Sequence, residues 1–144
     1  VLALDGMVTP TATVQSLQKA LAEKGAVIKS VDLVEGNWEG RPPVPATPAF
    51  LLDVKYAGLS AGEKLARLRA ALAEQKAGAM VVTRLDSVAW LLNLRASDID
   101  CTPFALAFCF VTPDDAMLFM DAGRLPAEAA AALGAQGVRV MDYE

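Results

Sequence analysis

The chain has 144 residues, of which 54% are hydrophobic, and its net charge of -4 with a sequence pI ≈ 4.8 makes it acidic. A chain of this length and apolar content can bury about two-thirds of its unfolded surface. The acidic balance argues against nucleic-acid binding, because phosphates would be repelled, and no apolar run is long enough to span a membrane.

Apolar spacing and turn residues predict an α/β fold, with strands and helices alternating along the chain. Ser60 and Glu63 form a capping box that starts the longest predicted helix. The run from Phe104 to Val111 is apolar on both faces, which predicts a central strand covered on each side. The predicted elements are, in chain order, a strand over 1–4, a helix over 10–24, a strand over 26–34, a helix over 60–78, a strand over 80–83, a helix over 86–93, strands over 104–111 and 117–120, a helix over 126–134 and a strand over 138–141.

A proline-rich stretch between residues 40 and 48 forbids regular structure. It is therefore the candidate junction between two domains, residues 1–48 and 49–144. Trp38 and Arg41 lie at the start of this junction. We expect Trp38 to pack there, with a subunit contact as the alternative, and Arg41 to pin the junction through carbonyl or carboxylate oxygens.

In the predicted helix over 86–93, Asp86 is expected to cap the N-terminus and Trp90 to lie in the core. Four hydrogen-bonding side chains end and follow this helix, without an intervening Gly or Pro: Asn93, Arg95, Ser97 and Asp98. Such side chains directly after a buried segment indicate a positioned loop. A guanidinium binds a carboxylate through two hydrogen bonds, and an Asp can hold a peptide's amino terminus, so Arg95 and Asp98 are candidates to contact a peptide. The alternative is structural: the two residues pair with each other or satisfy backbone groups of the loop.

The sequence contains no histidine and two cysteines, Cys101 and Cys109. Without an imidazole base, Cys–His catalysis cannot be assembled within the chain. On one extended strand the two cysteines would be separated by roughly 26 Å, which excludes a mutual disulfide and predicts buried, reduced thiols of a cytoplasmic protein. Asp114 and Asp115 are adjacent in a predicted turn, where their side chains diverge, so no metal site is expected there.

Four ordered segments resemble the three-domain Xaa-Pro aminopeptidases (aminopeptidase P). The most specific is similar to the family pattern L-D-x-I-A-W-L-L-N-x-R-G-x-D with a following Thr-Pro. The matching residues are Leu85, Asp86, Ala89, Trp90, Leu91, Leu92, Asn93, Arg95, Asp98, Thr102 and Pro103. The other segments lie at 31–45, 55–69 and 118–125, so the resemblance covers nearly the whole chain.

The resemblance implies a fold like the creatinase/prolidase N-terminal domain, a mixed sheet flanked by helices. It also implies a cytoplasmic, homodimeric parent enzyme that removes the N-terminal residue preceding proline. Such an enzyme uses two divalent metal ions, expected to be manganese, held by Asp, His and Glu in a C-terminal catalytic domain.

Because this chain has no histidine, we interpret it as a non-catalytic piece of such an enzyme, the end of the first domain plus the second. It would shape substrate access for a proline-containing peptide, support dimerisation and contact the catalytic domain in cis, with no catalytic or metal-binding residue of its own. The alternative is a stand-alone peptide- or protein-binding module of the same type, without hydrolase activity.

The candidate loop departs from the family pattern at three positions. Ala96 replaces the usual Gly, Asp100 a frequent Pro, and Cys101 a frequent Tyr or His. Ala96 implies that a positive φ at this position would be strained, and Cys101 removes an aromatic or imidazole group from the loop.

Overall fold

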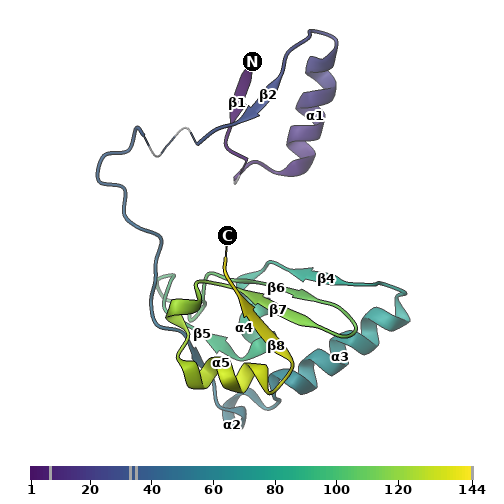
Figure 1. Ribbon diagram of the computed structural model, residues 1–144, viewed down its shortest axis with the longest axis vertical. Helices are drawn as coiled ribbons and strands as arrows, with labels where there is room; N and C mark the ends of the chain where they lie inside the picture. Colours follow the sequence, from purple (N-terminus) through teal and green to yellow (C-terminus); the bar gives the residue numbers. More distant parts are fainter. Residues whose placement is uncertain (7, 33, 35, 144) are drawn as a thin grey trace. The chain divides into compact units, whose positions relative to one another are not determined.

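The computed structural model of the chain divides into two units, Val1–Pro43 and Val44–Glu144 (Figure 1). It describes residues 1–6, 8–32, 34 and 36–143. Strands and helices alternate in both units, which confirms the predicted α/β class. The assignment of the units to a first and a second domain stays a prediction. None of the helices in the described ranges combines the length and the apolar character needed to cross a bilayer.

The first unit is a single strand–helix–strand repeat. β1 (Leu2–Leu4) and β2 (Ile28–Ser30) pair in parallel, and α1 (Thr11–Ala22) connects them. None of the described residues in this unit is buried. The second strand is shorter than the predicted 26–34, and Leu33 within that prediction lies outside the described residues.

The second unit is built on a four-stranded sheet in the order β4-β6-β7-β8. β4 (Met80–Val82), β6 (Phe108–Val111) and β7 (Ala116–Phe119) pair antiparallel in turn, and β8 (Val138–Met141) pairs parallel to β7. β4, β7 and β8 therefore run in one direction and β6 in the other. The predictions of a central strand and of the following hairpin are confirmed, although the central strand is shorter than expected.

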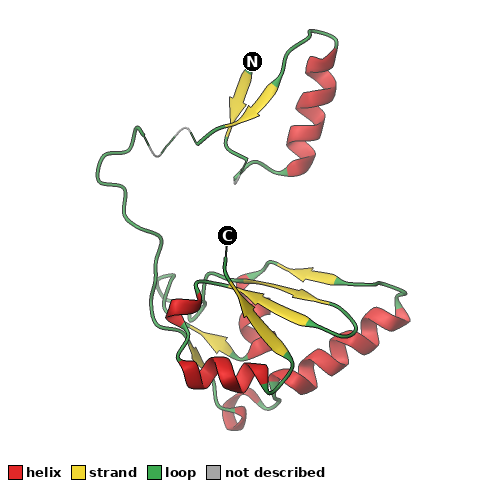
Figure 2. Cartoon of the chain, viewed as in Figure 1, coloured by secondary structure: helices red, strands yellow, loops and turns green. Residues whose placement is uncertain are grey.

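Three helices build the core of this unit from one side of the sheet (Figure 2). α3 (Ala61–Glu74) begins at the predicted capping box, in which the Glu63 N–H donates to Ser60 Oγ and the Ser60 N–H donates to the Glu63 carboxylate. α4 (Leu85–Leu92) and α5 (Ala127–Gly134) contribute further apolar side chains. The buried core includes Leu65, Val82, Leu91, Leu92, Cys109, Val111, Leu118, Leu133 and Val138.

The expectation that the central strand is covered on both sides is wrong for the described residues. Cys109 and Val111 are buried on the side of the helices, whereas Phe108 and Phe110 point to the opposite face and stay partly exposed. A continuous apolar run shows that the side chains on both faces of a strand could be buried. It does not show whether another segment packs against each face.

No sequence pattern predicted β3 (Phe50–Leu51), β5 (Leu94–Arg95) or the short helix α2 (Val54–Ala57). β3 and β5 pair antiparallel, with Phe50 opposite Arg95. Strands of two residues carry no periodic signal, and this pair joins segments that are far apart in the sequence. The pairing converts part of the predicted loop after α4 into a strand.

Two local predictions around α4 are wrong. Trp90 was expected in the core but is 56% exposed, with Lys64 Nζ 4.8 Å from its ring centroid. Asp86 was expected to cap the helix, but Arg84 holds that position and Asp86 lies in the first turn, where its carboxylate accepts from the Ser87 N–H at 2.7 Å. Because the helix is short, the pattern of polar and apolar residues along it indicates only weakly which side is buried and which is exposed.

Both cysteines are free thiols, but they do not share a strand, and only Cys109 is buried. Burial raises the pKa of the Cys109 thiol to about 11, whereas Cys101 is exposed in a loop. Because the thiolate is the reactive form, we expect an aromatic disulfide reagent at pH 8 to modify one thiol per chain rapidly. Cys101→Ser should remove this reaction and Cys109→Ala should preserve it; rapid modification of two thiols would contradict the burial of Cys109.

Candidate functional site

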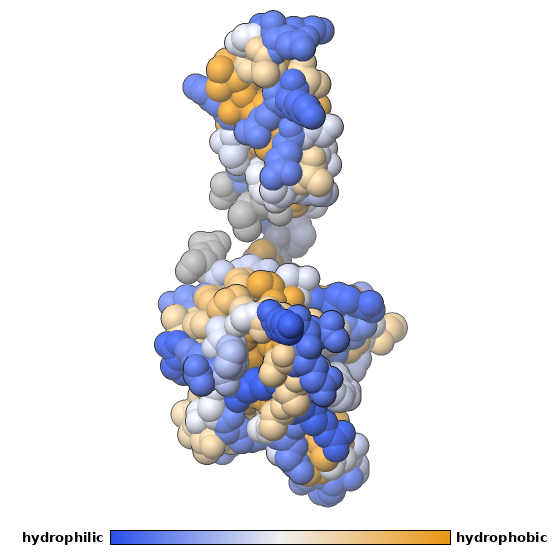
Figure 3. Space-filling model, turned by 90° about the vertical axis from the view of Figure 1, so that its right-hand side faces the viewer, coloured by the Kyte–Doolittle hydropathy of each residue, from blue (hydrophilic) through white to orange (hydrophobic). Residues whose placement is uncertain are grey.

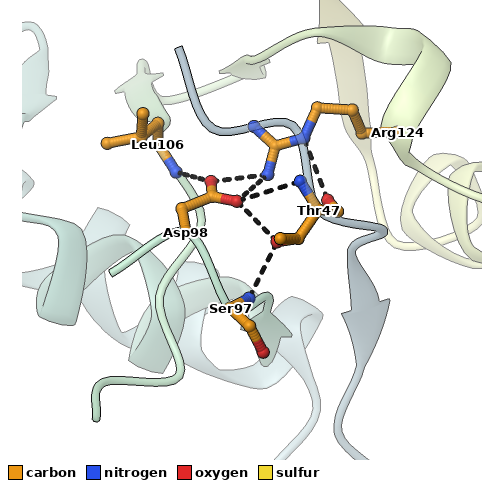
Figure 4. Close-up of polar contacts among 5 residues, drawn as sticks. All are labelled: Thr47, Ser97, Asp98, Leu106 and Arg124. Atoms are coloured by element: carbon orange, nitrogen blue, oxygen red, sulfur yellow. Dashed lines mark hydrogen bonds and ion pairs between the residues drawn. The ribbon is translucent and has the colours of Figure 1, made fainter. Parts of the chain in front are cut away.

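Asp98 is the centre of the most extensive polar cluster in the second unit (Figure 4). Its carboxylate accepts hydrogen bonds from the Arg124 guanidinium at 2.5 Å, from the Thr47 hydroxyl at 2.6 Å and from the Leu106 N–H at 2.7 Å. The Asp98 side chain is 0% exposed and that of Arg124 is 6% exposed. The cluster is therefore a buried ion pair whose carboxylate is fully hydrogen-bonded.

The environment of Asp98 keeps it ionised. Burial by itself would raise the pKa of the carboxyl. Hydrogen bonds from Arg124, Thr47 and Leu106, with the positive charge of Arg124, outweigh this effect and lower the pKa below its ordinary value. Removing either charged partner would leave the other charge buried and uncompensated, which is far more costly than losing a surface ion pair.

Thr47 connects this ion pair to the end of the proline-rich stretch. Its hydroxyl donates to Asp98 and accepts from the Ser97 N–H at 2.9 Å, while its carbonyl accepts from Arg124 Nε at 3.0 Å. Thr47 therefore connects three parts of the second unit: its first residues, the segment after β5 and the 3-10 turn η1 (Ala122–Arg124).

Asn93 organises a second cluster at the C-terminus of α4. It adopts the left-handed conformation, with φ 56°, that ends the helix. Its side-chain oxygen accepts from Lys64 Nζ at 2.5 Å, and its amide nitrogen donates to the Leu59 carbonyl at 2.9 Å. Lys64 Nζ also donates to the Trp90 carbonyl at 2.7 Å. Asn93 therefore holds α3, α4 and β5 together.

Two cations converge on this helix end. Lys64 is 2% exposed, and burial, followed by the nearby charge of Arg95, lowers the pKa of its ammonium group. Arg95 Nη1 donates to the carbonyls of Ala89 at 2.6 Å and Leu94 at 2.8 Å. The negative end of the helix dipole and its free carbonyls favour cations here. Among the described residues, no carboxylate forms an ion pair with either cation.

The four predicted site residues divide into two groups. Asn93 and Asp98 are buried and use their side chains in internal hydrogen bonds. Arg95 is half-buried and Ser97 is exposed, with a hydroxyl that bonds no described residue and points away from the ion pair (Figure 4). Asp98 pairs with Arg124 rather than with Arg95, so the two residues do not pair with each other. Both nevertheless satisfy backbone groups, as the structural alternative expected: Arg95 donates to two carbonyls and Asp98 accepts from the Leu106 N–H.

Three partners of these residues had no signal in the sequence: Thr47, Lys64 and Arg124. Lys64 follows the charged start of α3 and would ordinarily be assigned to solvent. Thr47 lies among prolines that suggest only an irregular linker. Arg124 comes from a short turn with no periodic pattern. All three residues are distant in sequence from their partners, so local sequence patterns could not predict these contacts.

Of the departures from the family pattern, Ala96 fits the local backbone and Cys101 does not. Ala96 is 2% exposed, and among the non-glycine residues the left-handed conformation in this segment belongs to Asn93 and Cys101, whose φ values are 56° and 61°. The position of Ala96 therefore does not require glycine. Cys101 is the residue that carries the backbone strain expected for a non-glycine side chain.

The predicted junction residues Trp38 and Arg41 lie together in the first unit. The Arg41 guanidinium carbon is 5.9 Å from the Trp38 ring centroid, and Arg41 forms an ion pair with Asp32 at 4.0 Å. Trp38 is 52% exposed. Their role at a domain junction stays a prediction.

The chain is similar to a known domain family and to several named proteins. The family described as Creatinase/Prolidase N-terminal domain matches residues 40–144. The chain is 46% identical over 113 residues to a protein named "Probable Xaa-Pro aminopeptidase P" from Sordaria macrospora, covering 78% of this chain and 18% of that protein. A protein of the same name from Coprinopsis cinerea is 40% identical over 144 residues, covering 98% of this chain and 23% of the relative.

A plant relative and a solved structure agree with this picture. Aminopeptidase P1 of Arabidopsis thaliana is 35% identical over 127 residues, which cover 87% of this chain and 20% of that protein. The crystal structure of X-prolyl aminopeptidase from Caenorhabditis elegans, described as a cytosolic enzyme with a di-nuclear active site, matches with a TM-score of 0.85 and 31% identity. That match covers 98% of this chain and 23% of the other, so the chain spans about a fifth of the length of these relatives.

Proposed function

Since the chain belongs to the Creatinase/Prolidase N-terminal domain family, we propose that it forms a non-catalytic N-terminal region of a metal-dependent Xaa-Pro aminopeptidase. The observation that carries this proposal is identity of 34–46% to proteins named for that activity, running in places over almost the whole chain. The complete protein encoded by the same reading frame is called the parent below. We place it in the cytoplasm and assign it removal of an N-terminal residue that precedes proline.

The residues of this chain do not fit a two-metal centre. It has no histidine, and in the described ranges no three Cys, Asp or Glu side chains are grouped so that they could hold a metal ion. We therefore assign the two divalent ions, proposed to be manganese, and all catalytic groups to another part of the parent. Peptide hydrolysis by the parent with and without added manganese tests this assignment.

The contribution that we propose for this region is to shape substrate access, to contact the catalytic domain in cis and to support a homodimer. The segment over 93–98 is suited to positioning because both ends are fixed, by Asn93 to the helix end and by Asp98 to Arg124. A segment held in this way presents Arg95 and Ser97 at low cost in conformational entropy.

Arg95 is the residue of this segment with the chemistry to contact a peptide or the catalytic domain. Only its Nη1 is used by the described residues, so Nε and Nη2 remain able to bind a carboxylate. We expect Arg95→Ala in the parent to lower kcat/KM for an Xaa-Pro peptide about 10- to 100-fold, the equivalent of one lost charged hydrogen bond.

Arg84→Ala, at an exposed guanidinium on the residue that precedes α4, is the matched control and should leave kcat/KM unchanged. Since Arg95 also bonds the end of α4, the melting temperature is measured for every variant. Unchanged kcat/KM with a lowered melting temperature in Arg95→Ala would assign Arg95 a purely structural role.

A further inference from the structure

Arg95 is held in place by one nitrogen of its guanidinium. Nη1 donates to the carbonyls of Ala89 in α4 and Leu94 in β5. Within the described ranges, Nε and Nη2 donate to no residue. These two nitrogens form the edge of the guanidinium that binds a carboxylate through two parallel hydrogen bonds. Because the side chain is half-buried and anchored through Nη1, this edge is held in one orientation.

The positive charge at this end of α4 has no anionic partner in the part of the chain that the structure describes. Lys64, which is 2% exposed, donates to two uncharged oxygens, the Trp90 carbonyl at 2.7 Å and Asn93 Oδ1 at 2.5 Å. Burial, and then the charge of Arg95, lowers the pKa of the Lys64 ammonium group, so the two cations repel each other. A carboxylate bound to Arg95 would offset this repulsion.

Phe50 lies across the strand pair from Arg95. Phe50 in β3 is directly opposite Arg95 in β5, and residues opposed in this way have Cβ atoms about 5 Å apart on the same face. The next pair, Leu51 and Leu94, points to the other face, where Leu94 is 1% exposed and belongs to the core. Phe50 and Arg95 therefore face away from the core, and Phe50 is 52% exposed.

An exposed aromatic ring is not by itself evidence of a binding site. Figure 3 shows apolar surface among hydrophilic side chains on one face of this unit, and such apolar surface is common on folded proteins. Phe50 differs because its strand partner on the same face is an anchored guanidinium. A ring beside a guanidinium suits a group that combines an apolar side chain with a carboxylate, and the last residue of a peptide is such a group.

Both strands are fixed by hydrogen bonds outside the pair. The Leu52 N–H donates to the Asn93 carbonyl at 2.8 Å, and the Ala49 N–H donates to the Arg124 carbonyl at 2.9 Å. Arg124 in turn binds Asp98, which follows β5. The two side chains are therefore presented on a fixed support, which lowers the conformational entropy lost on binding.

We propose that Arg95 and Phe50 form a subsite for the last residue of a short peptide, with the guanidinium bound to its free α-carboxylate and the ring packed on its side chain. The inference rests on the proposed function, because it takes the ligand to be a peptide that the parent cleaves. Proline as the last residue suits both groups, since its ring is apolar and lies next to the carboxylate. An aspartate or glutamate from another part of the parent carries the same carboxylate, but its binding would not respond to amidation of the peptide.

Amidation removes the α-carboxylate and leaves the rest of the peptide unchanged. The parent should hydrolyse Arg-Pro-Pro with a kcat/KM about 10- to 100-fold above that for Arg-Pro-Pro amide, the range for a charged hydrogen bond. Arg95→Ala should lower hydrolysis of the acid to the level of the amide and change that of the amide by less than about twofold. Arg95→Lys should keep part of the preference, because an ammonium group supplies the charge but not two parallel hydrogen bonds.

Peptides that differ in their last side chain test the role of Phe50. Phe50→Ala should lower kcat/KM for Arg-Pro-Pro about 3- to 10-fold, the range for one aromatic contact, and leave that for Arg-Pro-Gly unchanged. The control Tyr56→Ala, at a ring that is 72% exposed on α2, should change neither value. An equal loss for the two peptides in Phe50→Ala would contradict packing of the ring on the last side chain.

Two results for the carboxylate would overturn the inference. One is equal kcat/KM of the wild type for acid and amide, and the other is an equal loss for both in Arg95→Ala, which would assign Arg95 to a carboxylate of the parent itself. Calorimetric binding of an Arg-Pro-Pro analogue with a reduced first peptide bond, as acid and as amide, needs no hydrolysis. An inert parent that binds the acid about 10- to 100-fold more tightly would contradict only the proposed activity. An active parent without this preference would overturn only the subsite.

Discussion

Asp98→Ala should lower the free energy of unfolding of the chain by about 3–5 kcal/mol, the range for breaking a buried ion pair by removing one partner. The variant leaves the Arg124 guanidinium, with 6% of its side chain exposed, without a carboxylate, and it removes the acceptor of the Thr47 hydroxyl and the Leu106 N–H. Urea unfolding followed by tryptophan fluorescence measures the change.

The exposed carboxylate of Asp114 provides the control for this experiment. Asp114→Ala should change the free energy of unfolding by less than about 0.5 kcal/mol. A double variant, Asp98→Leu with Arg124→Met, should recover much of the loss, because two apolar side chains leave no buried charge unpaired. A loss below about 1 kcal/mol in Asp98→Ala would contradict the buried ion pair.

The same ion pair gives the chain a defined dependence on pH. The folded-state pKa of Asp98 is lowered, so its stabilising contribution is complete above the unfolded-state pKa of about 3.9 and is lost as pH falls through the folded-state value. The difference in free energy of unfolding between the wild type and Asp98→Asn should therefore shrink as the pH is lowered below about 4. A difference that stays constant down to pH 2 would contradict this assignment.

Asn93→Ala should lower the free energy of unfolding by about 2–4 kcal/mol. It removes the acceptor of the buried Lys64 ammonium and the donor to the Leu59 carbonyl, and an alanine at φ 56° is strained by about 1–2 kcal/mol. Thermal and urea unfolding of the same variant provide two independent measurements.

Asn93→Gly separates the two causes, because glycine accepts the left-handed backbone but makes neither side-chain hydrogen bond. We expect Asn93→Gly to recover about 1 kcal/mol relative to Asn93→Ala. Equal stabilities would show that the backbone is not strained, and a wild-type stability in both variants would exclude Asn93 as the link between α3, α4 and β5.

Local signals in the sequence predicted local structure well. The Ser60 and Glu63 capping box marks the start of α3 because its hydrogen bonds join residues three positions apart. The hairpin of β6 and β7 follows from two apolar runs around a short turn. The longer helices and the strands of the main sheet were predicted for the same reason, since periodicity depends only on neighbouring residues, whereas β3, β5 and α2 are too short to carry such a signal.

Contacts between distant segments were not predictable in this way. The motif that ends α4 contains Asn93, Arg95 and Asp98, but the partners Lys64 and Arg124 come from other elements. A lysine that is 2% exposed and a tryptophan that is 56% exposed both run against the ordinary preference of their side chains. Only the three-dimensional arrangement shows that Trp90 faces solvent and that the carbonyls at the C-terminus of α4 accept from the buried Lys64 and the half-buried Arg95.

The most direct test of the proposed function is release of the first residue from an Arg-Pro-Pro peptide by the parent and by this 144-residue chain, each with and without manganese. We predict metal-dependent release by the parent and none by the chain, because the chain has no histidine and its described residues form no metal-binding group. Release by the chain alone would contradict its assignment as a non-catalytic region. An inert parent would contradict the peptidase assignment and favour a peptide-binding module.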